Sequence, residues 1–406
     1  MKNLIKVTLF FSLLMVAGNL YAFDAGNVEI HGFVSQGYMK SSDNNFLADT
    51  EDGTFQFNEL GINFGTWLTA DLRLGMQLFA RDLGAEGNDE VVVDWAFADY
   101  AWKEWMGLRV GKMKLVGGVY NEVRDMDMIR TSALLPQSIY PELYRDTFTS
   151  IKGFGLYGKI PLSLMGSLSY TGQMGVLPIK ADGGFADAFI QNVYIGKGYR
   201  VTVDSMDHDY YSTFQGKWHT PLTGLTVGGS CYEFDGLIIE GDIVSPVSLA
   251  YSYDVKTMSG RYYSVEYTWE NLQLLYEETF MNIKGELTAG PMVVPSRAPL
   301  EGWYAAGSYR FTEWFELGAG YSEYYPRSTD KDGKTNDIPT TRRAWDFENW
   351  LKDANVSFRF DVNENWIIKL EVHDMNGFGS FSTAENELND LEEDWMLYVA
   401  KITYSF

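Results

Sequence analysis

The last nine residues, 398–406, read Tyr-Val-Ala-Lys-Ile-Thr-Tyr-Ser-Phe, and their alternation decides the fold class. Every second side chain from Tyr398 to Phe406 is apolar or small, and the side chains between them include Lys401 and Thr403. A period of two residues is that of an extended chain whose successive side chains point to opposite faces. The stretch therefore predicts a β-strand with one apolar, aromatic-rich face.

The same alternation recurs upstream, for example on both sides of a polar turn at 310–315 and again around 363–365. Seven short turns are predicted, near 69–71, 103–105, 161, 221, 270–271, 310–315 and 363–365. Eight longer connections are predicted at 39–52, 82–90, 115–150, 173–208, 235–258, 283–299, 326–349 and 377–392. Short turns on one side and long loops on the other are typical of transmembrane β-barrels, which close because lipid cannot satisfy an open sheet edge. We predict an all-β, closed antiparallel transmembrane barrel of about 16 strands.

The positions of the tryptophans agree with this prediction. Seven of the twelve lie within a few residues of a short turn. These seven are Trp67, Trp102, Trp105, Trp218, Trp269, Trp314 and Trp366. Aromatic side chains gather at the membrane interface of a barrel, whereas a soluble β-sandwich would more often bury them in its core.

Composition excludes several other classes of protein. The 406 residues are 16% aromatic and carry a formal net charge of −23, which argues against disorder and against nucleic-acid binding. The single cysteine, Cys231, excludes an internal disulfide and a four-cysteine zinc site. Beyond the N-terminus there is no run of about 18 apolar residues that could form a transmembrane helix.

The N-terminus has the features of a secretory signal. Lys2 and Lys6 precede an apolar stretch at 7–17, and small residues follow up to Ala22. We predict a signal peptide over 1–22 and a barrel domain over 23–406, with 115–150 as a separate functional segment.

The face opposite the apolar one carries charges of both signs, which a water-filled interior accepts more readily than a packed core. The basic residues on this face are Arg73, Arg81, Arg109, Lys159, Lys217, Arg310, Arg359, Lys369 and Lys401. The acidic ones are Glu59, Asp99, Glu266, Glu277, Glu316 and Glu371. A plugged, salt-bridged interior is the alternative, but the first strand is predicted near Val28, directly after the signal, which leaves no room for a plug domain.

The connection at 115–150 is too long and too apolar for a solvated surface loop. With the signal peptide, the sixteen alternating strands, the terminal Phe406 and the opening at 30–38, it makes the whole mature chain resemble the outer-membrane porin superfamily. In that family the third long loop folds into the lumen and narrows the pore, and the terminal strand is recognised by the barrel-assembly machinery. The resemblance is architectural and does not specify a substrate.

The resemblance implies a pore constriction with an acidic and a basic side. Glu122, Asp125 and Asp127 would form the acidic side on the segment 115–150. The opposing wall would be formed by Arg73, Arg81, Arg109, Arg359, Lys369 and Lys401. The basic residues of the segment itself, Arg124, Arg130 and Arg145, either pair with neighbouring acids or line a path for anions.

These features predict a porin of the bacterial outer membrane that forms a water-filled channel for passive diffusion of small hydrophilic solutes and ions. The alternative is a substrate-selective channel, for example for phosphate or another anion. A barrel hydrolase that uses His373 is a third and weaker hypothesis. We expect no enzyme activity, no cofactor, no metal and no nucleic acid, a homotrimer, and contacts with membrane lipid and lipopolysaccharide.

Overall fold

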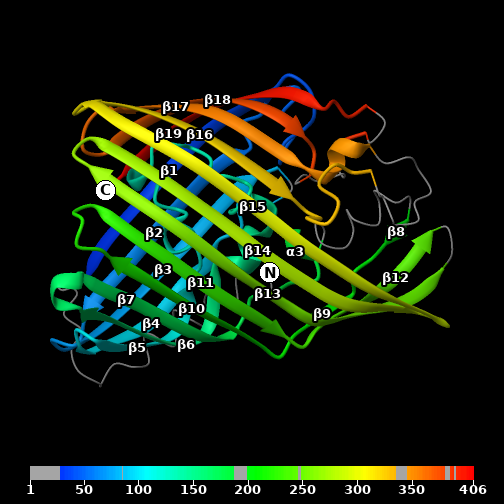
Figure 1. Cartoon of the computed structure of the whole chain (residues 1–406), viewed down its shortest axis with the longest axis horizontal. Coiled ribbons are helices and arrows are strands. Elements are labelled where there is room, and N and C mark those ends of the chain that lie inside the picture. The colour runs from blue at the N-terminus through cyan, green and yellow to red at the C-terminus, as the bar shows by residue number, and fades with distance from the viewer. Residues whose placement is uncertain are drawn as a thin grey trace, which may run out of the picture.

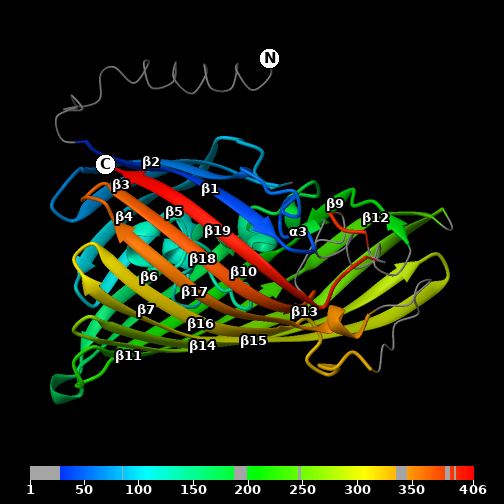
Figure 2. The same cartoon turned by 90° about the horizontal axis from the view of Figure 1, so that it is seen from above.

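The computed structural model of the chain describes residues 28–84, 86–186, 199–245, 248–334, 345–379, 385–387 and 390–406. The predicted signal peptide over 1–22 lies outside these residues and stays a prediction. The described chain forms one large antiparallel sheet that closes on itself when the last strand pairs with the first. Figure 2 shows this closure, with the C-terminal strand lying beside the N-terminal one.

Nineteen strands make up the sheet, and sixteen of them form the closed ring. The ring contains β1 (Glu29–Ser41), β2 (Phe57–Trp67), β3 (Leu72–Leu83), β4 (Val92–Lys103), β5 (Met106–Lys114), β6 (Ser150–Pro161), β7 (Ser167–Val176), β10 (Tyr210–His219), β11 (Leu225–Asp235), β13 (Leu249–Trp269), β14 (Leu272–Ala289), β15 (Met292–Thr312), β16 (Phe315–Tyr325), β17 (Leu351–Asp361), β18 (Trp366–Gly377) and β19 (Asp394–Ser405). The other three are β8 (Arg200–Val201), β9 (Ser205–Asp207) and β12 (Leu237–Ser245), of which β12 pairs with the first part of β13. The predicted sixteen-strand barrel is confirmed.

All seven predicted short turns join neighbouring strands at one rim, and both described ends of the barrel lie there (Figure 1). The closure is completed by two backbone hydrogen bonds of 3.0 Å between Gly32 and Phe406, each residue donating its N–H to the other's carbonyl. Phe406 therefore extends the hydrogen-bonded pairing of β19 with β1 by one residue beyond Ser405, where β19 ends.

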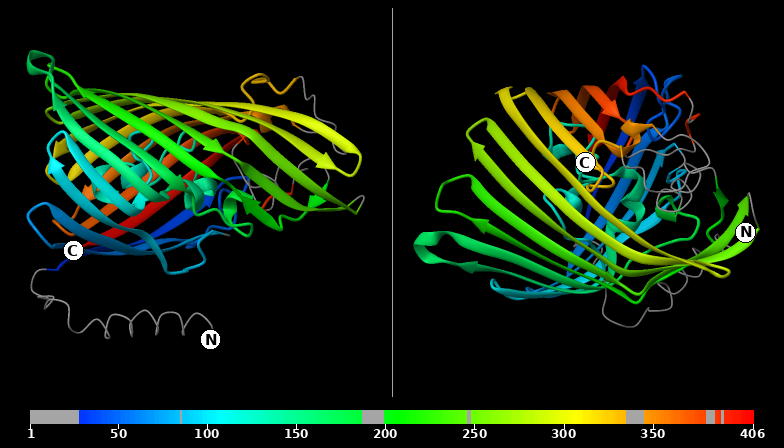
Figure 3. Two further views of the ribbon diagram at one scale, coloured as in Figure 1. Left: turned by 90° about the horizontal axis from the view of Figure 1, so that it is seen from below. Right: turned by 45° about the vertical axis from the view of Figure 1, so that its right-hand side comes forward.

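The predicted long connections at 235–258 and 283–299 are wrong. β12 and β13 occupy most of the first range, and β14 and β15 run on through the second to a two-residue turn at Gly290 and Pro291. The outward side chains of these extensions are largely polar, which made them look like loops. Their inward side chains, such as Ile283 and Tyr253, are buried in a hydrophobic cluster that keeps the strands paired. Figure 3 shows the extensions projecting beyond the rest of the barrel.

The two faces of the strands differ as the alternation predicts. In β19 the outward Ile402 is 39% exposed, whereas the inward Lys401 is 3% exposed. The seven tryptophans near the short turns are all exposed, as expected for an aromatic rim. The outer face is thus apolar and available to lipid, and the inner face is polar and charged.

Within the described residues, helical structure is confined to short pieces. They are η2 (Asn121–Val123), η3 (Asp127–Ile129), η4 (Glu142–Tyr144), α2 (Arg145–Phe148), η5 (Ser163–Met165), α3 (Gly184–Ala186) and η7 (Asp346–Asn349). Four of the seven, η2 to α2, lie in the connection between β5 and β6. No helix among the described residues is long and apolar enough to cross a membrane.

Candidate functional site

The connection between β5 and β6 packs against the polar inner face of the barrel. We call residues 115–149 the β5–β6 segment. Its two ends are held together by a hydrogen bond of 2.9 Å from the Leu115 N–H to the Thr149 carbonyl. Its apolar side chains join three separate hydrophobic clusters, represented by Leu115, Leu134 and Tyr140. Such burial explains why the segment is more apolar than a solvated loop.

Asp127, at the start of η3, is paired with three cations. Its Oδ1 lies 2.8 Å from Arg130 and 3.7 Å from Lys369, and its Oδ2 lies 2.9 Å from Lys401. The Thr403 hydroxyl donates a further hydrogen bond of 2.7 Å to Oδ2. Lys369 comes from β18 and Lys401 from β19, so this carboxylate ties the segment to the wall beside the closure of the barrel. Burial by itself raises the pKa of Asp127, but the three cations outweigh it and hold this pKa well below its usual range.

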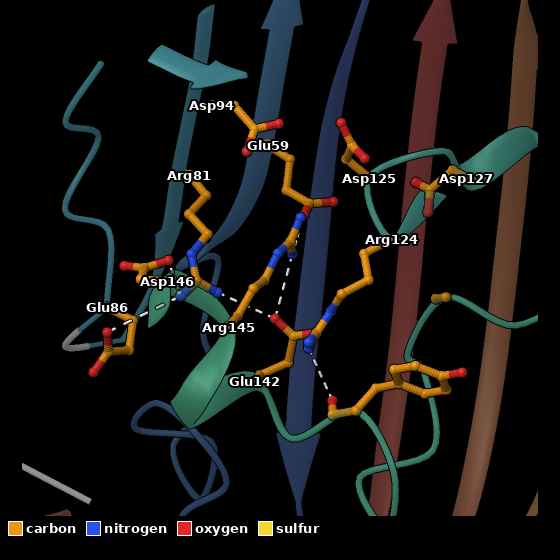
Figure 4. Close-up of polar contacts among 12 residues, drawn as sticks. Glu59, Arg81, Glu86, Asp94, Arg124, Asp125, Asp127, Glu142, Arg145 and Asp146 are labelled. Atoms are coloured by element: carbon orange, nitrogen blue, oxygen red, sulfur yellow. Dashed lines mark hydrogen bonds and ion pairs between the residues drawn. The ribbon is translucent and has the colours of Figure 1, made fainter. Parts of the chain in front are cut away.

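A second network surrounds Glu142 of η4 (Figure 4). One oxygen of Glu142 lies 3.0 Å from Arg124, and the other lies 3.1 Å from Arg81 and 3.3 Å from Arg145. Arg145 also contacts Glu59 of β2 at 2.6 Å, and Glu59 in turn contacts Lys401 at 2.7 Å.

Burial alone would raise the pKa of Glu142, but the Arg124, Arg145 and Arg81 guanidiniums together hold it well below its usual range. The two networks meet at Lys401, which contacts both Glu59 and Asp127. Together they form one connected set of charges, which we call the charge cluster. Its basic members are Arg81, Arg124, Arg130, Arg145, Lys369 and Lys401, and its acidic members are Glu59, Glu86, Asp127, Glu142 and Asp146.

The other two predicted acids lie apart from this cluster. Asp125 contacts Lys114 at 3.1 Å and accepts a hydrogen bond of 2.5 Å from Gln77 on β3. Glu122 is half-buried, and burial raises its pKa although Lys217 and Arg109 act in the opposite direction. The three acids therefore do not face one common gap.

Only some of the basic residues predicted for the wall contact the β5–β6 segment in the structure. Arg81, Lys369 and Lys401 contact acids of the segment, and Arg359 donates to the backbone carbonyls of Met128 and Arg130 at 2.8 and 3.2 Å. Arg109 instead pairs with Asp99 at 3.0 Å. Arg73 lies opposite Asp99 in the register of β3 and β4, near the short-turn rim. These two side chains are thus placed away from Asp127.

The basic residues of the segment pair with acids, which was one of the two alternatives. Arg124 contacts Glu142, and Arg130 contacts Asp127. Arg130 also donates to the carbonyls of Arg124, Ser132 and Ala133 at 2.6, 3.2 and 3.3 Å. Its guanidinium is therefore engaged by the segment's own backbone.

A second anchor, Glu277, joins Val119 and Tyr140 of the segment to the barrel wall. Glu277 of β14 is fully buried and accepts hydrogen bonds from the Val119 N–H at 3.0 Å and the Tyr140 hydroxyl at 2.7 Å. The neighbouring Gly118 has φ of +69°, and a Cβ there would lie 2.4 Å from the Glu277 carboxylate. Only glycine fits this position without strain.

A third anchor uses a buried carboxylate of β18. Glu371 accepts the N–H groups of Ala133 and Leu134 at 2.6 and 3.1 Å. His373 lies between Glu371 and Asp353, with its two ring nitrogens 3.2 and 2.9 Å from their oxygens. Both ring nitrogens of His373 thus face carboxylates, and neither faces a hydroxyl nucleophile.

Among the spaces between the segment and the wall, two are lined by residues of the predicted site. The smaller, of about 330 Å³, is bounded by parts of the charge cluster on the β2 and β3 side. The larger, of about 500 Å³, lies between the segment and β14–β17, and we call it the wall cleft. Small residues such as Ala306 and Gly318 leave this space along the wall.

Comparison with known protein families and with curated proteins finds no match to this chain. Solved structures share its architecture. Salmonella typhi OmpF is 13% identical, with a TM-score of 0.56 over 95% of this chain and 100% of that one. An anion-selective porin from Comamonas acidovorans is 10% identical, with a TM-score of 0.54 over 93% and 99%. Vibrio cholerae OmpT in its trimer form is 11% identical, with a TM-score of 0.53 over 93% and 99%.

The barrel has the porin fold. Identities this low establish the fold and leave the solute open. The closed ring with its apolar outer face places the porin-like barrel in the bacterial outer membrane, because lipid tolerates a β-structure only when no edge is left unpaired.

Sequence reasoning missed several residues that organise the site. Glu142, at the centre of one network, lies inside the predicted segment but was not assigned to the constriction. Glu59, Glu277 and Glu371 were placed on the inward face without a partner. The alternation that places these side chains on the inward face was the available signal, but their partners in the β5–β6 segment lie 86 to 238 residues away in the chain.

Proposed function

We propose that the protein is a porin that forms a water-filled channel for passive diffusion of small hydrophilic solutes and ions. The observation that carries the proposal is the β5–β6 segment, tied by buried ion pairs to the polar inner face of a sixteen-strand barrel. A segment anchored there narrows the lumen without filling it. Sixteen strands enclose more space than side chains alone can fill.

The path of the solute in this proposal is the wall cleft. The cleft is the larger of the two spaces, and its wall side is lined by small and polar residues of β14–β17. On the opposite side of the barrel, the charge cluster joins the segment to β2, β3, β18 and β19 and leaves less room.

The test is the conductance of the purified protein in planar bilayers. We expect stable single-channel currents that scale with salt concentration. Ala306→Trp places a large ring in the wall cleft and is expected to lower the conductance roughly two-fold or more. The matched control is Ala305→Trp, because Ala305 is exposed, directly precedes the inward Ala306 on β15 and does not line the wall cleft. Absence of any conductance, or equal effects of both substitutions, would contradict the proposal.

Selectivity for an anion is the second candidate, and the charge cluster favours it. The cluster contains six basic and five acidic side chains, so it carries an excess of one positive charge. One structural neighbour is an anion-selective porin by its name. Reversal potentials in a salt gradient distinguish the two candidates, because a general channel shows only a weak preference and a selective channel a strong one.

Assembly and partners belong to the same proposal. We expect a homotrimer, since one structural neighbour is a trimer form, and crosslinking of the native membrane would show it. We also expect recognition of Phe406 by the barrel-assembly machinery, contacts with lipopolysaccharide, and removal of residues 1–22. The proposal includes no catalytic activity. The site of the hydrolase hypothesis, His373, has carboxylates at both ring nitrogens, so it lacks the free nitrogen that a general base needs.

A further inference from the structure

The chemistry of the wall cleft differs from that of the charge cluster. The ionised side chain that lines the cleft is Arg130, whose guanidinium is occupied by Asp127 and by three backbone carbonyls. Glu316 lies behind the lining residue Thr131 and is bound by that hydroxyl and by Arg310 at 2.6 Å. An ionic solute in the cleft would therefore meet no lining side chain with an uncompensated charge.

Neutral hydrogen-bonding groups face the same space. Gln273 of β14 and the hydroxyl of Tyr120 have no hydrogen-bond partner among the described residues, and both line the cleft. Asn355 of β17 also lines it, and its one side-chain contact is a long hydrogen bond of 3.4 Å from its Nδ2 to Asp353. Two amides and a phenol supply both donors and acceptors without charge. Water can satisfy such groups, and a solute that carries hydroxyl or amide groups can replace water at them.

We propose that the wall cleft is a binding subsite for an uncharged, polyhydroxylated solute of saccharide type, contacted by Tyr120, Gln273 and Asn355. This inference rests on the proposed channel function and names the class of solute that its passage favours. The space of about 500 Å³ includes solvent at its open side, so a sugar ring would lie against the wall and would not be fully enclosed. Glu266, an inward carboxylate on β13, lies opposite the lining residue Leu275 in the register of β13 and β14 but is not itself among the lining residues.

Three solutes of nearly equal size test the charge preference: glucose, gluconate and glucosamine. Each is added to the purified protein in a planar bilayer, and the reduction and noise of the ion current report its binding. We expect glucose to bind more tightly than either charged relative. Gln273→Ala and Asn355→Ala should each weaken glucose binding about 2- to 10-fold, which is the range for loss of one hydrogen bond.

Asn63→Ala provides the control, because Asn63 is an inward amide on β2 that lines neither space. Heat-modifiability on gels shows that each variant is a folded barrel. A protein that conducts ions but binds gluconate or glucosamine as tightly as glucose, or whose Gln273 and Asn355 variants behave like the control, refutes the subsite alone. A folded protein that conducts nothing refutes the channel and the subsite together.

Discussion

Replacing Asp127 by Asn tests whether buried ion pairs hold the β5–β6 segment in place. The Asp127 side chain contacts Arg130, Lys369 and Lys401, and all four side chains are at most 5% exposed. Asn has nearly the same shape and can keep the hydrogen bond from Thr403, so the substitution removes the charge with little change in volume. Three buried cations then lose their shared counterion.

The expected cost follows from that burial. Removing one partner of a buried ion pair costs about 3 to 5 kcal/mol, because the remaining charge stays in a poorly solvating environment. At about 3 kcal/mol, the equilibrium between the anchored and the released segment changes by roughly 100-fold. The contact of 2.9 Å between the exposed Asp146 and the buried Arg81 serves as the control, because Arg81 keeps its contact with Glu142 when Asp146 is replaced. The Asp146 side chain is 55% exposed, so Asp146→Asn should cost no more than about 1 kcal/mol.

Hydrogen exchange of the segment, measured by mass spectrometry on the folded barrel, reports this difference directly. We expect amides of residues 127–134 to exchange much faster in Asp127→Asn than in Asp146→Asn. The reversal potential should also move toward anions, further still when Asp125 is replaced by Asn in addition, because negative charge leaves the narrow part of the lumen. Equal exchange in the two single variants would refute the anchoring role. An unchanged reversal potential of the Asp125 and Asp127 double variant at low and high salt would show that these acids do not influence the constriction.

Three further predictions concern other positions. Burial raises the pKa of Glu122 above its ordinary value of 4.5, so its proton is gained as the pH falls through that raised pKa. Cation preference should therefore decrease at a pH where an ordinary glutamate is still ionised, and Glu122→Gln should remove this step from the reversal potential measured against pH. Gly118→Ala should destabilise the second anchor by about 1 to 3 kcal/mol, because φ is positive and the new Cβ collides with Glu277, and faster exchange of residues 118–121 would show it. Deleting Phe406, whose backbone closes the ladder with Gly32, should slow assembly, and an unchanged barrel yield and heat-modifiability would contradict this.

Much of the barrel follows from local patterns in the sequence. Alternation with period two is a property of each strand by itself, so stretches such as 398–406 reveal both the strand and its two faces. The turns next to the seven tryptophans were found for the same reason. The extensions of β14 and β15 were not found, because their outward polar side chains resemble a loop and their buried side, around Ile283, depends on packing with distant residues.

The sequence by itself determined the fold class, the sixteen strands and the inward charges, and it distinguished 115–150 from a solvated loop. Tertiary structure alone decided how those charges are used. Asp127 meets Lys401 across 274 residues of sequence, and Glu59 meets Arg145 across 86, so no local pattern contains these pairs. The sequence predicts acids and bases that face each other across a gap, whereas in the structure several of them form direct, buried ion pairs. The wall cleft lies on the other side of the segment, along β14–β17. The physical reason is that closing the barrel brings the wall within reach of the segment, where desolvated charges are stable only in contact with one another.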